Sequence, residues 1–187
     1  MIDTVHPVTT EHHIIRILQQ DKRLSKYKLK LHAQSKYGID IEATGSGYED
    51  FGIEVESCNA SWPLDTPYPK SWKSGFTVPT RKLKFYEKFP LSVFVKVNHS
   101  LTRAAVVPMS FVCAAEKTVM PSRTSSYFSS DEMFIIRNEQ HPAICYCRIE
   151  DLPSVIDGLF KSMSQMKRSA VKYSDGRPIF TKSKGEK

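Results

Sequence analysis

Apolar and acidic residues alternate in two short segments of the chain, residues 38–43 and residues 51–57. Alternation with a period of two residues is typical of a β-strand that has one apolar face and one polar face. The intervening Gly45-Ser46-Gly47 contains residues that tolerate positive φ, so we expect the two segments to pair as an antiparallel hairpin. One face of this hairpin would carry four carboxylates, those of Asp40, Glu42, Glu54 and Glu56.

Strand and helix periods continue along most of the remaining chain. The expected elements are, in order, a helix over 11–20, a strand over 27–33, the two acidic strands, a proline-rich loop over 62–72, a helix from Pro79 to about residue 88, strands over 92–98, 103–114, 133–137 and 143–148, and a helix over 153–166. This order predicts an α/β or α+β fold with a mixed central β-sheet and flanking helices. We expect one domain over residues 1–175 and a basic, mobile C-terminal tail over residues 176–187.

Positive charge is unevenly distributed along the chain. The formal net charge is +7, but residues 161–187 contain eight Lys or Arg against Asp175 and Glu186, so the remainder is close to neutral. Within that remainder, basic residues are concentrated in residues 22–36 and 70–88, on either side of the acidic hairpin. If these segments also flank the hairpin in space, they would form a ring of positive charge around an acidic pocket, which suits a polyanionic ligand. A mixed surface of ordinary solubility would show the same counts.

The sequence gives no indication of export or of a membrane partner. Its N-terminus lacks a basic start followed by an apolar stretch, and no run approaches the roughly 18 apolar residues that cross a bilayer. The four cysteines show neither the spacing of a zinc site nor the density of a secreted disulfide scaffold. We therefore expect a soluble, cytoplasmic protein with buried thiols at Cys58, Cys113, Cys145 and Cys147.

The carboxylates of the predicted hairpin would repel one another, at a cost of a few tenths of a kcal/mol to about 1 kcal/mol for each directly opposed pair. A hard divalent cation offsets this repulsion, and Mg²⁺ commonly uses one or two carboxylates together with substrate phosphates. Alternatively, the acids point into water on a solvated sheet face. A third interpretation is a glycosidase with two catalytic carboxylates, in which Trp62, Tyr68 and Trp72 would stack on sugars.

The elements expected over residues 9–107 follow one order: a helix, a three-stranded meander, a helix and a strand. The first helix contains Glu11. Asp40 stands at the start of the second strand of the meander, and Glu54-Val55-Glu56 lies on the third. This order resembles the core of the PD-(D/E)XK nuclease superfamily, the restriction-endonuclease-like fold. The resemblance implies a nuclease-like domain in which Asp40 and Glu54 hold Mg²⁺, or Mn²⁺ in its place, and in which Glu11 adds a ligand. No proline precedes Asp40, and Glu56 stands where most members have a lysine. Some members carry a second glutamate there, and in others the lysine lies on the following helix, where this chain has Arg81, Lys82 and Lys84.

These features together predict a Mg²⁺-dependent hydrolase of phosphodiester bonds, most simply a DNA endonuclease. Asp40 and Glu54 would bind the metal, and Glu56 would be a further ligand or the general base. Lys82 would face the charge that develops in the transition state. The nucleic-acid backbone would contact a further set of basic residues, namely Lys36, Lys73, Arg81 and Lys84.

The alternative function is a non-catalytic protein of the same fold that binds nucleic acid or another protein. Nucleases of this fold often act as homodimers, so the resemblance leaves a homodimer open. The sequence contains no motif that reads bases. It therefore does not distinguish DNA from RNA as the substrate, or a duplex from a branched or single-stranded one.

Overall fold

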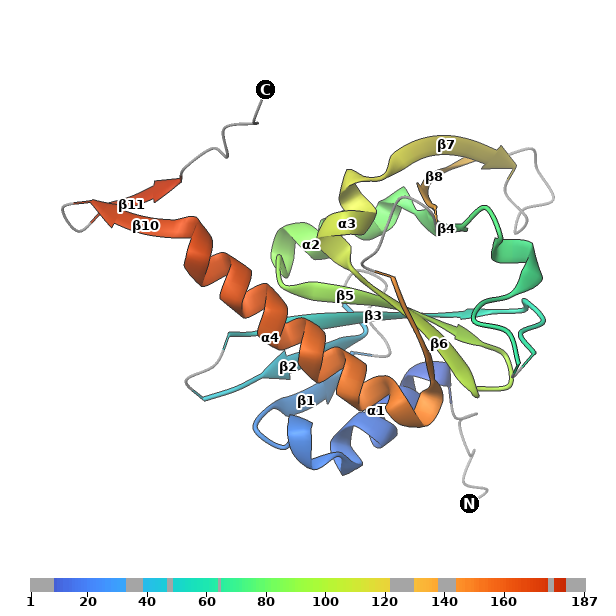
Figure 1. Cartoon of the computed structure of the whole chain (residues 1–187), viewed down its shortest axis with the longest axis horizontal. Coiled ribbons are helices and arrows are strands. Elements are labelled where there is room, and N and C mark those ends of the chain that lie inside the picture. The colour runs from blue at the N-terminus through green and yellow to red at the C-terminus, as the bar shows by residue number, and fades with distance from the viewer. Residues whose placement is uncertain are drawn as a thin grey trace, which may run out of the picture.

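The computed structural model describes residues 9–32, 39–46, 49–63, 65–121, 130–137, 144–174 and 177–180. Over this part of the chain the fold is mixed α and β, with a mixed central sheet and flanking helices, so this part of the expectation is confirmed. Figure 1 shows the sheet between a lower layer of long helices and an upper layer that contains a second, smaller sheet.

The central sheet has six strands in the order β1-β2-β3-β5-β6-β9. Strands β3 and β5 run parallel, and every other neighbouring pair in this sheet is antiparallel. The connection from β3 to β5 passes through the upper layer, which is how a parallel pair is usually joined. The strands are β1 (Lys28–Leu31), β2 (Ile41–Thr44), β3 (Phe51–Cys58), β5 (Ser92–Asn98), β6 (Arg103–Pro108) and β9 (Cys145–Arg148).

Two helices, α1 (Thr10–Gln20) and α4 (Leu152–Ala170), cover one face of the central sheet (Figure 1). The side-chain oxygen of Thr9 caps the N-terminus of α1. Both helices bury residues at helical spacing, and Phe160 of α4 stacks on Phe51 of β3 with 3.8 Å between ring centroids. This first core includes Ile14, Ile15, Leu18, Phe51, Ile53, Val55, Leu152, Ile156, Phe160 and Met163.

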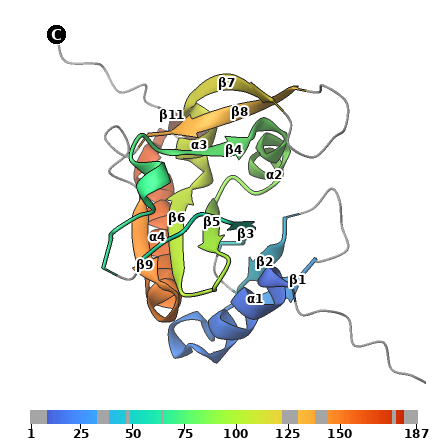
Figure 2. The same ribbon diagram turned by 90° about the vertical axis from the view of Figure 1, so that its right-hand side faces the viewer.

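The opposite face of the central sheet packs against a three-stranded sheet in the order β4-β8-β7 and two short helices (Figure 2). These elements are β4 (Phe76–Pro79), α2 (Leu83–Lys88), α3 (Met109–Ala114), β7 (Glu116–Pro121) and β8 (Ser130–Ile136). Short 3-10 helices η1 (Lys22–Leu24), η2 (Lys70–Trp72), η3 (Thr80–Lys82) and η4 (Ile149–Asp151) join longer elements. The second core lies here and includes Trp62, Trp72, Phe76, Val78, Phe94, Val107, Met109 and Phe134.

A proline stands at two of the boundaries that differ from the sequence prediction. Strand β6 ends at Pro108 and residues 109–114 form α3, so the expected strand over 103–114 is wrong in its second half. Pro79 ends β4 and is the N-cap of η3, so the helix expected from Pro79 to about residue 88 is present as a 3-10 turn continued by α2. A proline has no N–H for a strand ladder and its fixed φ suits an entry into helical turns, which accounts for both changes.

The C-terminal end of α4 leaves the body of the protein and leads into a hairpin of β10 (Val171–Ser174) and β11 (Arg177–Phe180) (Figure 1). Met163 is 6% exposed and Met166 is 56% exposed, which marks where α4 leaves the first core. The hairpin forms a two-stranded sheet of its own. The tail boundary expected after residue 175 falls between its two strands, and residues 181–187 lie outside the described residues.

No helix within the described ranges is both long and apolar enough to cross a membrane. All four cysteines are free thiols; Cys147 is buried and the other three are half-buried. Burial raises the pKa of Cys147 to about 12 and that of Cys113 to about 11. The thiolate is the reactive form of cysteine, so burial keeps the reactive fraction of these two thiols small at neutral pH.

Candidate functional site

Glu54 and Glu56 lie on the face of β3 that meets the second core, because the residues alternating with them belong to the first core. The register of the parallel pair sets Glu56 beside Lys96 of β5. We use the name acid-lysine cluster for the group formed by Asp40, Glu54, Glu56, Lys82 and Lys96. Its members come from the start of β2, from β3, from η3 and from β5.

Glu54 is the most buried carboxylate of the cluster, with 0% of the residue exposed. Its Oε1 is ion-paired with the Nζ of Lys82. Its Oε2 is buried and has no hydrogen-bond partner among the described residues. An ionised group in such a position is costly unless paired and hydrogen-bonded, so this oxygen would be stabilised by added positive charge or by an added hydrogen-bond donor.

Asp40 immediately precedes β2, and its Oδ2 accepts a hydrogen bond of 2.8 Å from the backbone N–H of Val55. This bond attaches Asp40 to β3 at the residue between the two glutamates. Burial raises the pKa of Asp40, and the Val55 N–H and the charge of Lys82 partly oppose this effect. Asp40 is therefore a desolvated carboxyl next to Glu54, an arrangement often found at functional sites.

Lys82 reaches the cluster from η3, the turn that precedes α2. Burial lowers its pKa, while the negative charges of Asp40 and Glu11 act in the opposite direction. The side chain is 16% exposed and lies in the field of at least these two acids besides its partner Glu54. The lysine chosen from the sequence as the transition-state cation is thus beside the two carboxylates chosen as metal ligands.

Lys96 is a member of the cluster that the sequence analysis missed. It is only 7% exposed, and its Nζ lies 2.7 Å from Oε1 of Glu56 and 3.0 Å from the backbone oxygen of Thr77. The ammonium also lies over the rings of Phe76 and Phe94, at 5.6 and 6.0 Å from their centroids. A single lysine in an otherwise apolar buried strand was the available signal, because such a charge needs a partner inside the protein.

Two acids expected at the site, Glu42 and Glu11, lie apart from the acid-lysine cluster or at its margin. Glu42 pairs with His32 of the neighbouring edge, with 2.9 Å between Oε2 and Nε2, so the expected grouping of four carboxylates reduces to three. Glu11, in the first turn of α1, is near enough to act electrostatically on Asp40 and Lys82. Glu11 therefore lies at the margin of the cluster.

The basic residues expected to bind nucleic acid lie mainly around η3 and α2. Arg81 and Lys84 are exposed beside Lys82, and the charge of Lys84 helps to lower the pKa of Lys82. Lys73 is exposed at the end of η2. Lys36 lies outside the described residues. Positive charge is therefore present at the surface next to the cluster, on the side formed by η3 and α2.

A search of the described ranges finds no group of three or more His, Cys, Asp or Glu side chains that could hold a metal ion. Mg²⁺ does not need such a group, because it usually keeps several waters and binds one or two carboxylates. Asp40 and Glu54 supply two carboxylates, and Oε2 of Glu54 has no hydrogen-bond partner among the described residues. Carboxylate oxygens are the ligand type that Mg²⁺ prefers, and Lys82 is the neighbouring protein cation.

Trp62 and Trp72, considered above as sugar-stacking residues, are each 6% exposed. Their rings contact each other edge to face at 5.3 Å between centroids, and both belong to the second core. They consequently present no open aromatic platform for a sugar. Tyr68 is half-buried and packs near Tyr146, with 5.4 Å between centroids.

Asp40→Asn is expected to stabilise the metal-free protein at neutral pH. Burial raises the pKa of Asp40 in the folded state, so the folded protein favours the protonated carboxyl. The stability that the protonated carboxyl gives is fully present below the unfolded pKa, and it is lost as the pH rises through the folded pKa. Asparagine keeps an acceptor for the Val55 N–H and removes the charge. Thermal melting in EDTA should show a higher Tm for the variant at pH 7, by about 2–4 °C for each kcal/mol gained.

The two melting curves should converge at about pH 3, below the ordinary pKa of an Asp carboxyl. Asp50→Asn is the matched control, since Asp50 is exposed, and its Tm should follow that of the parent. A lower Tm for Asp40→Asn at pH 7 would show that the ionised carboxylate stabilises the fold.

Comparisons with protein-family models, with curated proteins and with solved structures found no match for this chain.

Proposed function

We propose that this protein is a Mg²⁺-dependent nuclease that hydrolyses phosphodiester bonds, with DNA as its substrate, and that its core is restriction-endonuclease-like. The order α1-β1-β2-β3-β4-α2-β5, in which β4 belongs to the smaller sheet and β3 and β5 are parallel neighbours in the central sheet, supports the proposal for the fold. The position of Asp40 at the start of β2 and of Glu54 on β3 supports the proposal for the site.

The observation that carries the proposal is the state of Glu54. Glu54 is fully buried, its neighbour Val55 binds the desolvated carboxyl of Asp40, and one of its oxygens has no partner among the described residues. Stability alone explains this arrangement poorly. Core positions are usually apolar, and an ion pair buried in place of apolar residues is often neutral or unfavourable for stability. A ligand that carries positive charge accounts for such an arrangement.

In this proposal Asp40 and Glu54 hold the metal, and Glu11 contributes from the first turn of α1. A Mg²⁺ ion held by these carboxylates would supply Lewis acidity towards the phosphate and would activate water as the nucleophile. Glu56, which is 29% exposed, accepts the proton of the attacking water as general base. Lys82 and Lys96 offset the negative charge of the reacting phosphate.

The exposed Lys and Arg residues next to the cluster have a separate role in this proposal. Lys73, Arg81 and Lys84 contact the phosphate backbone on either side of the cleaved bond. Contacts of this kind position the nucleic acid and raise affinity without reading sequence. They also offset the repulsion between a polyanion and the carboxylates of the site.

A second candidate function is a non-catalytic nucleic-acid-binding or protein-binding protein of the same fold. One observation favours it: Glu54 and Glu56 are each already ion-paired with a lysine of the protein itself, Lys82 and Lys96. Such pairs hold the acids together without a metal. The two candidates differ in whether Mg²⁺ binds at Asp40 and Glu54 and whether a phosphodiester is then cut.

The test is a titration of the parent and of Asp40→Asn with Mg²⁺ and with Mn²⁺, followed by thermal melting, with plasmid nicking measured on the same samples. We expect metal to raise the Tm of the parent and to support nicking, and we expect both effects to be lost in the variant. Stabilisation without nicking would favour the non-catalytic candidate with a retained metal site. Absence of both effects in the folded parent would overturn the nuclease proposal.

A further inference from the structure

The C-terminal arm is the one part of the described chain that stands clear of both sheets (Figure 1). We define the arm as the last turns of α4 after Met163 together with β10 and β11. Met163 is the last buried residue of α4 among those whose side chains the structure describes, and the hairpin that follows pairs with itself rather than with the central or the smaller sheet. The backbone pairing of the arm is therefore separate from that of both sheets.

An isolated two-stranded hairpin is at best marginally stable in water. The local sequence favours this hairpin, because Ser174 pairs with Arg177 across Asp175-Gly176, a dipeptide typical of tight two-residue turns. Local preference alone does not hold such a ribbon in one place. An element of this kind gains order when a partner lies against it.

The charge of the arm identifies the chemistry of that partner. Residues 167–180 contain four Lys or Arg against the single acid Asp175, and more Lys residues follow up to residue 187. A segment of this composition is attracted to a polyanion and repelled by basic surfaces. The bases within the described elements of the arm are Lys167, Arg168, Lys172 and Arg177.

The shape of the arm selects among polyanions. The two paired strands of a hairpin lie about 4.8 Å apart, so the backbone ribbon formed by β10 and β11 is narrower than a groove of about 12 Å. The major groove of B-form DNA is about 12 Å wide and admits a two-stranded β-ribbon. The deep, narrow major groove of A-form RNA does not admit side chains in this way, and single strands are usually bound in grooves lined with stacking aromatics.

We propose that the C-terminal arm binds duplex DNA. The β10-β11 ribbon would lie along the major groove, and the Lys and Arg residues of the arm would contact the phosphates. The arm is then an affinity element outside the acid-lysine cluster. This inference rests on the proposed function for its link to cleavage, but the binding itself can be measured without cleavage.

The test uses the full chain and a fluorescently labelled DNA duplex of about two helical turns in EDTA, with anisotropy measured over a series of salt concentrations. The arm variant combines Lys167→Gln, Arg168→Gln, Lys172→Gln and Arg177→Gln. Each phosphate contact contributes about 0.9 to the slope of log K against log salt, so we expect the slope to fall by about 3 to 4. We also expect binding to weaken by about tenfold or more at moderate salt.

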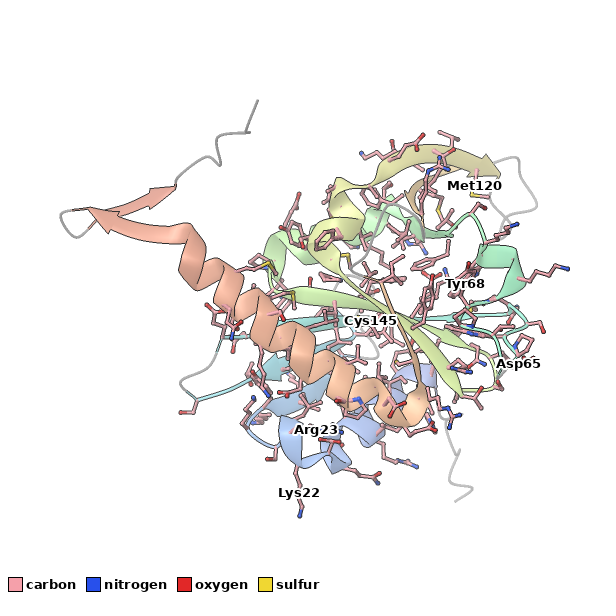
Figure 3. The ribbon with its side chains drawn as sticks, in the orientation of Figure 1. Lys22, Arg23, Asp65, Tyr68, Met120 and Cys145 are labelled. Atoms are coloured by element: carbon pink, nitrogen blue, oxygen red, sulfur yellow. The ribbon has the colours of Figure 1, made fainter. Side chains whose placement is uncertain are left out.

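The matched control removes the same charge from α1, η1 and β1, through Arg16→Gln, Lys22→Gln, Lys28→Gln and Lys30→Gln. All four residues are exposed, and Figure 3 shows Lys22 projecting from the body. We expect this control to change the slope by about one or less. An unchanged slope in the arm variant, or equal losses in both variants, would overturn the assignment of binding to the arm.

A single strand of the same length and a duplex RNA serve as competing probes. The loss caused by the arm variant should be greatest for duplex DNA, and equal losses for all three would overturn the placement in the groove. Nicking of a plasmid by the parent and by Asp40→Asn is measured in parallel. Nicking without an effect of the arm on binding overturns this inference alone, and arm-dependent binding without nicking overturns the nuclease proposal alone.

Discussion

Glu54→Gln is expected to lower the rate of Mg²⁺-dependent cleavage by about a thousandfold or more, which corresponds to about 4 kcal/mol of transition-state stabilisation. The amide fits the same fully buried space, so the change removes charge rather than volume. A neutral oxygen is a weaker ligand for a hard cation than a carboxylate. The rate is measured as single-turnover nicking of a supercoiled plasmid, with enzyme in excess.

The affinity for uncut DNA without metal should be equal to that of the parent or higher, because Glu54→Gln removes a negative charge from the surroundings of the phosphate. Glu42→Gln is the matched control. It makes the same chemical change on β2, where the side chain pairs with His32 instead of joining the acid-lysine cluster. We expect its cleavage rate to stay close to that of the parent. A folded Glu54→Gln protein that cuts at the parental rate would exclude Glu54 as a metal ligand.

The positions of Asp40 and Glu54 follow from local sequence. Strict alternation over residues 51–57 fixes which residues of β3 share a face, and a one-residue shift would bury the acids among the apolar side chains of the first core. Asp40 lies one residue before β2, and the antiparallel register of β2 and β3 brings it to Val55. The short hairpin connection made this part predictable.

The partners of the acids were harder to predict because they depend on pairing between distant segments. Glu56 meets Lys96 only because β3 and β5 are parallel and in one particular register across a connection of more than thirty residues. Glu42 turns to His32 because β1 and β2 lie side by side, which the alternation of either strand does not reveal. The alternation along a strand shows on which face of the sheet a side chain lies, but it does not show which residue of another strand lies next to it.

The pairing of the smaller sheet and the hairpin of the arm were not predicted, although the strand expected over 133–137 overlaps β8. The two omissions have different reasons. Strand β4 is a four-residue segment with a terminal proline, and its partner β8 lies more than fifty residues later, so no local pattern indicates the pair. The hairpin of β10 and β11 did carry a local signal in Asp175-Gly176. The expectation of a basic, mobile tail rested on the excess of Lys and Arg and on the few apolar residues after Phe180.

Lys82→Met is expected to lower the free energy of unfolding by about 3–5 kcal/mol at neutral pH without metal. Methionine occupies a similar length, but Glu54, whose side chain is 1% exposed, loses the ammonium that pairs with it. Removal of one partner from a buried ion pair leaves a charge that must stay desolvated or take up a proton. Urea denaturation followed by fluorescence measures the change, because Trp62 and Trp72 lie in the second core.

The response of this variant to Mg²⁺ separates a metal site from a purely structural ion pair. If Asp40 and Glu54 hold Mg²⁺, millimolar metal should recover much of the lost stability, since the ion replaces the missing positive charge and binds the folded state. The double variant Glu54→Leu with Lys82→Met removes both charges, and it should return to within about 2 kcal/mol of the parent and show no response to Mg²⁺. Equal stabilisation of the single and double variants by Mg²⁺ would place the ion elsewhere. A single variant as stable as the parent would mean that groups other than Lys82 satisfy Glu54, and the ion pair could then be broken by substrate at little cost.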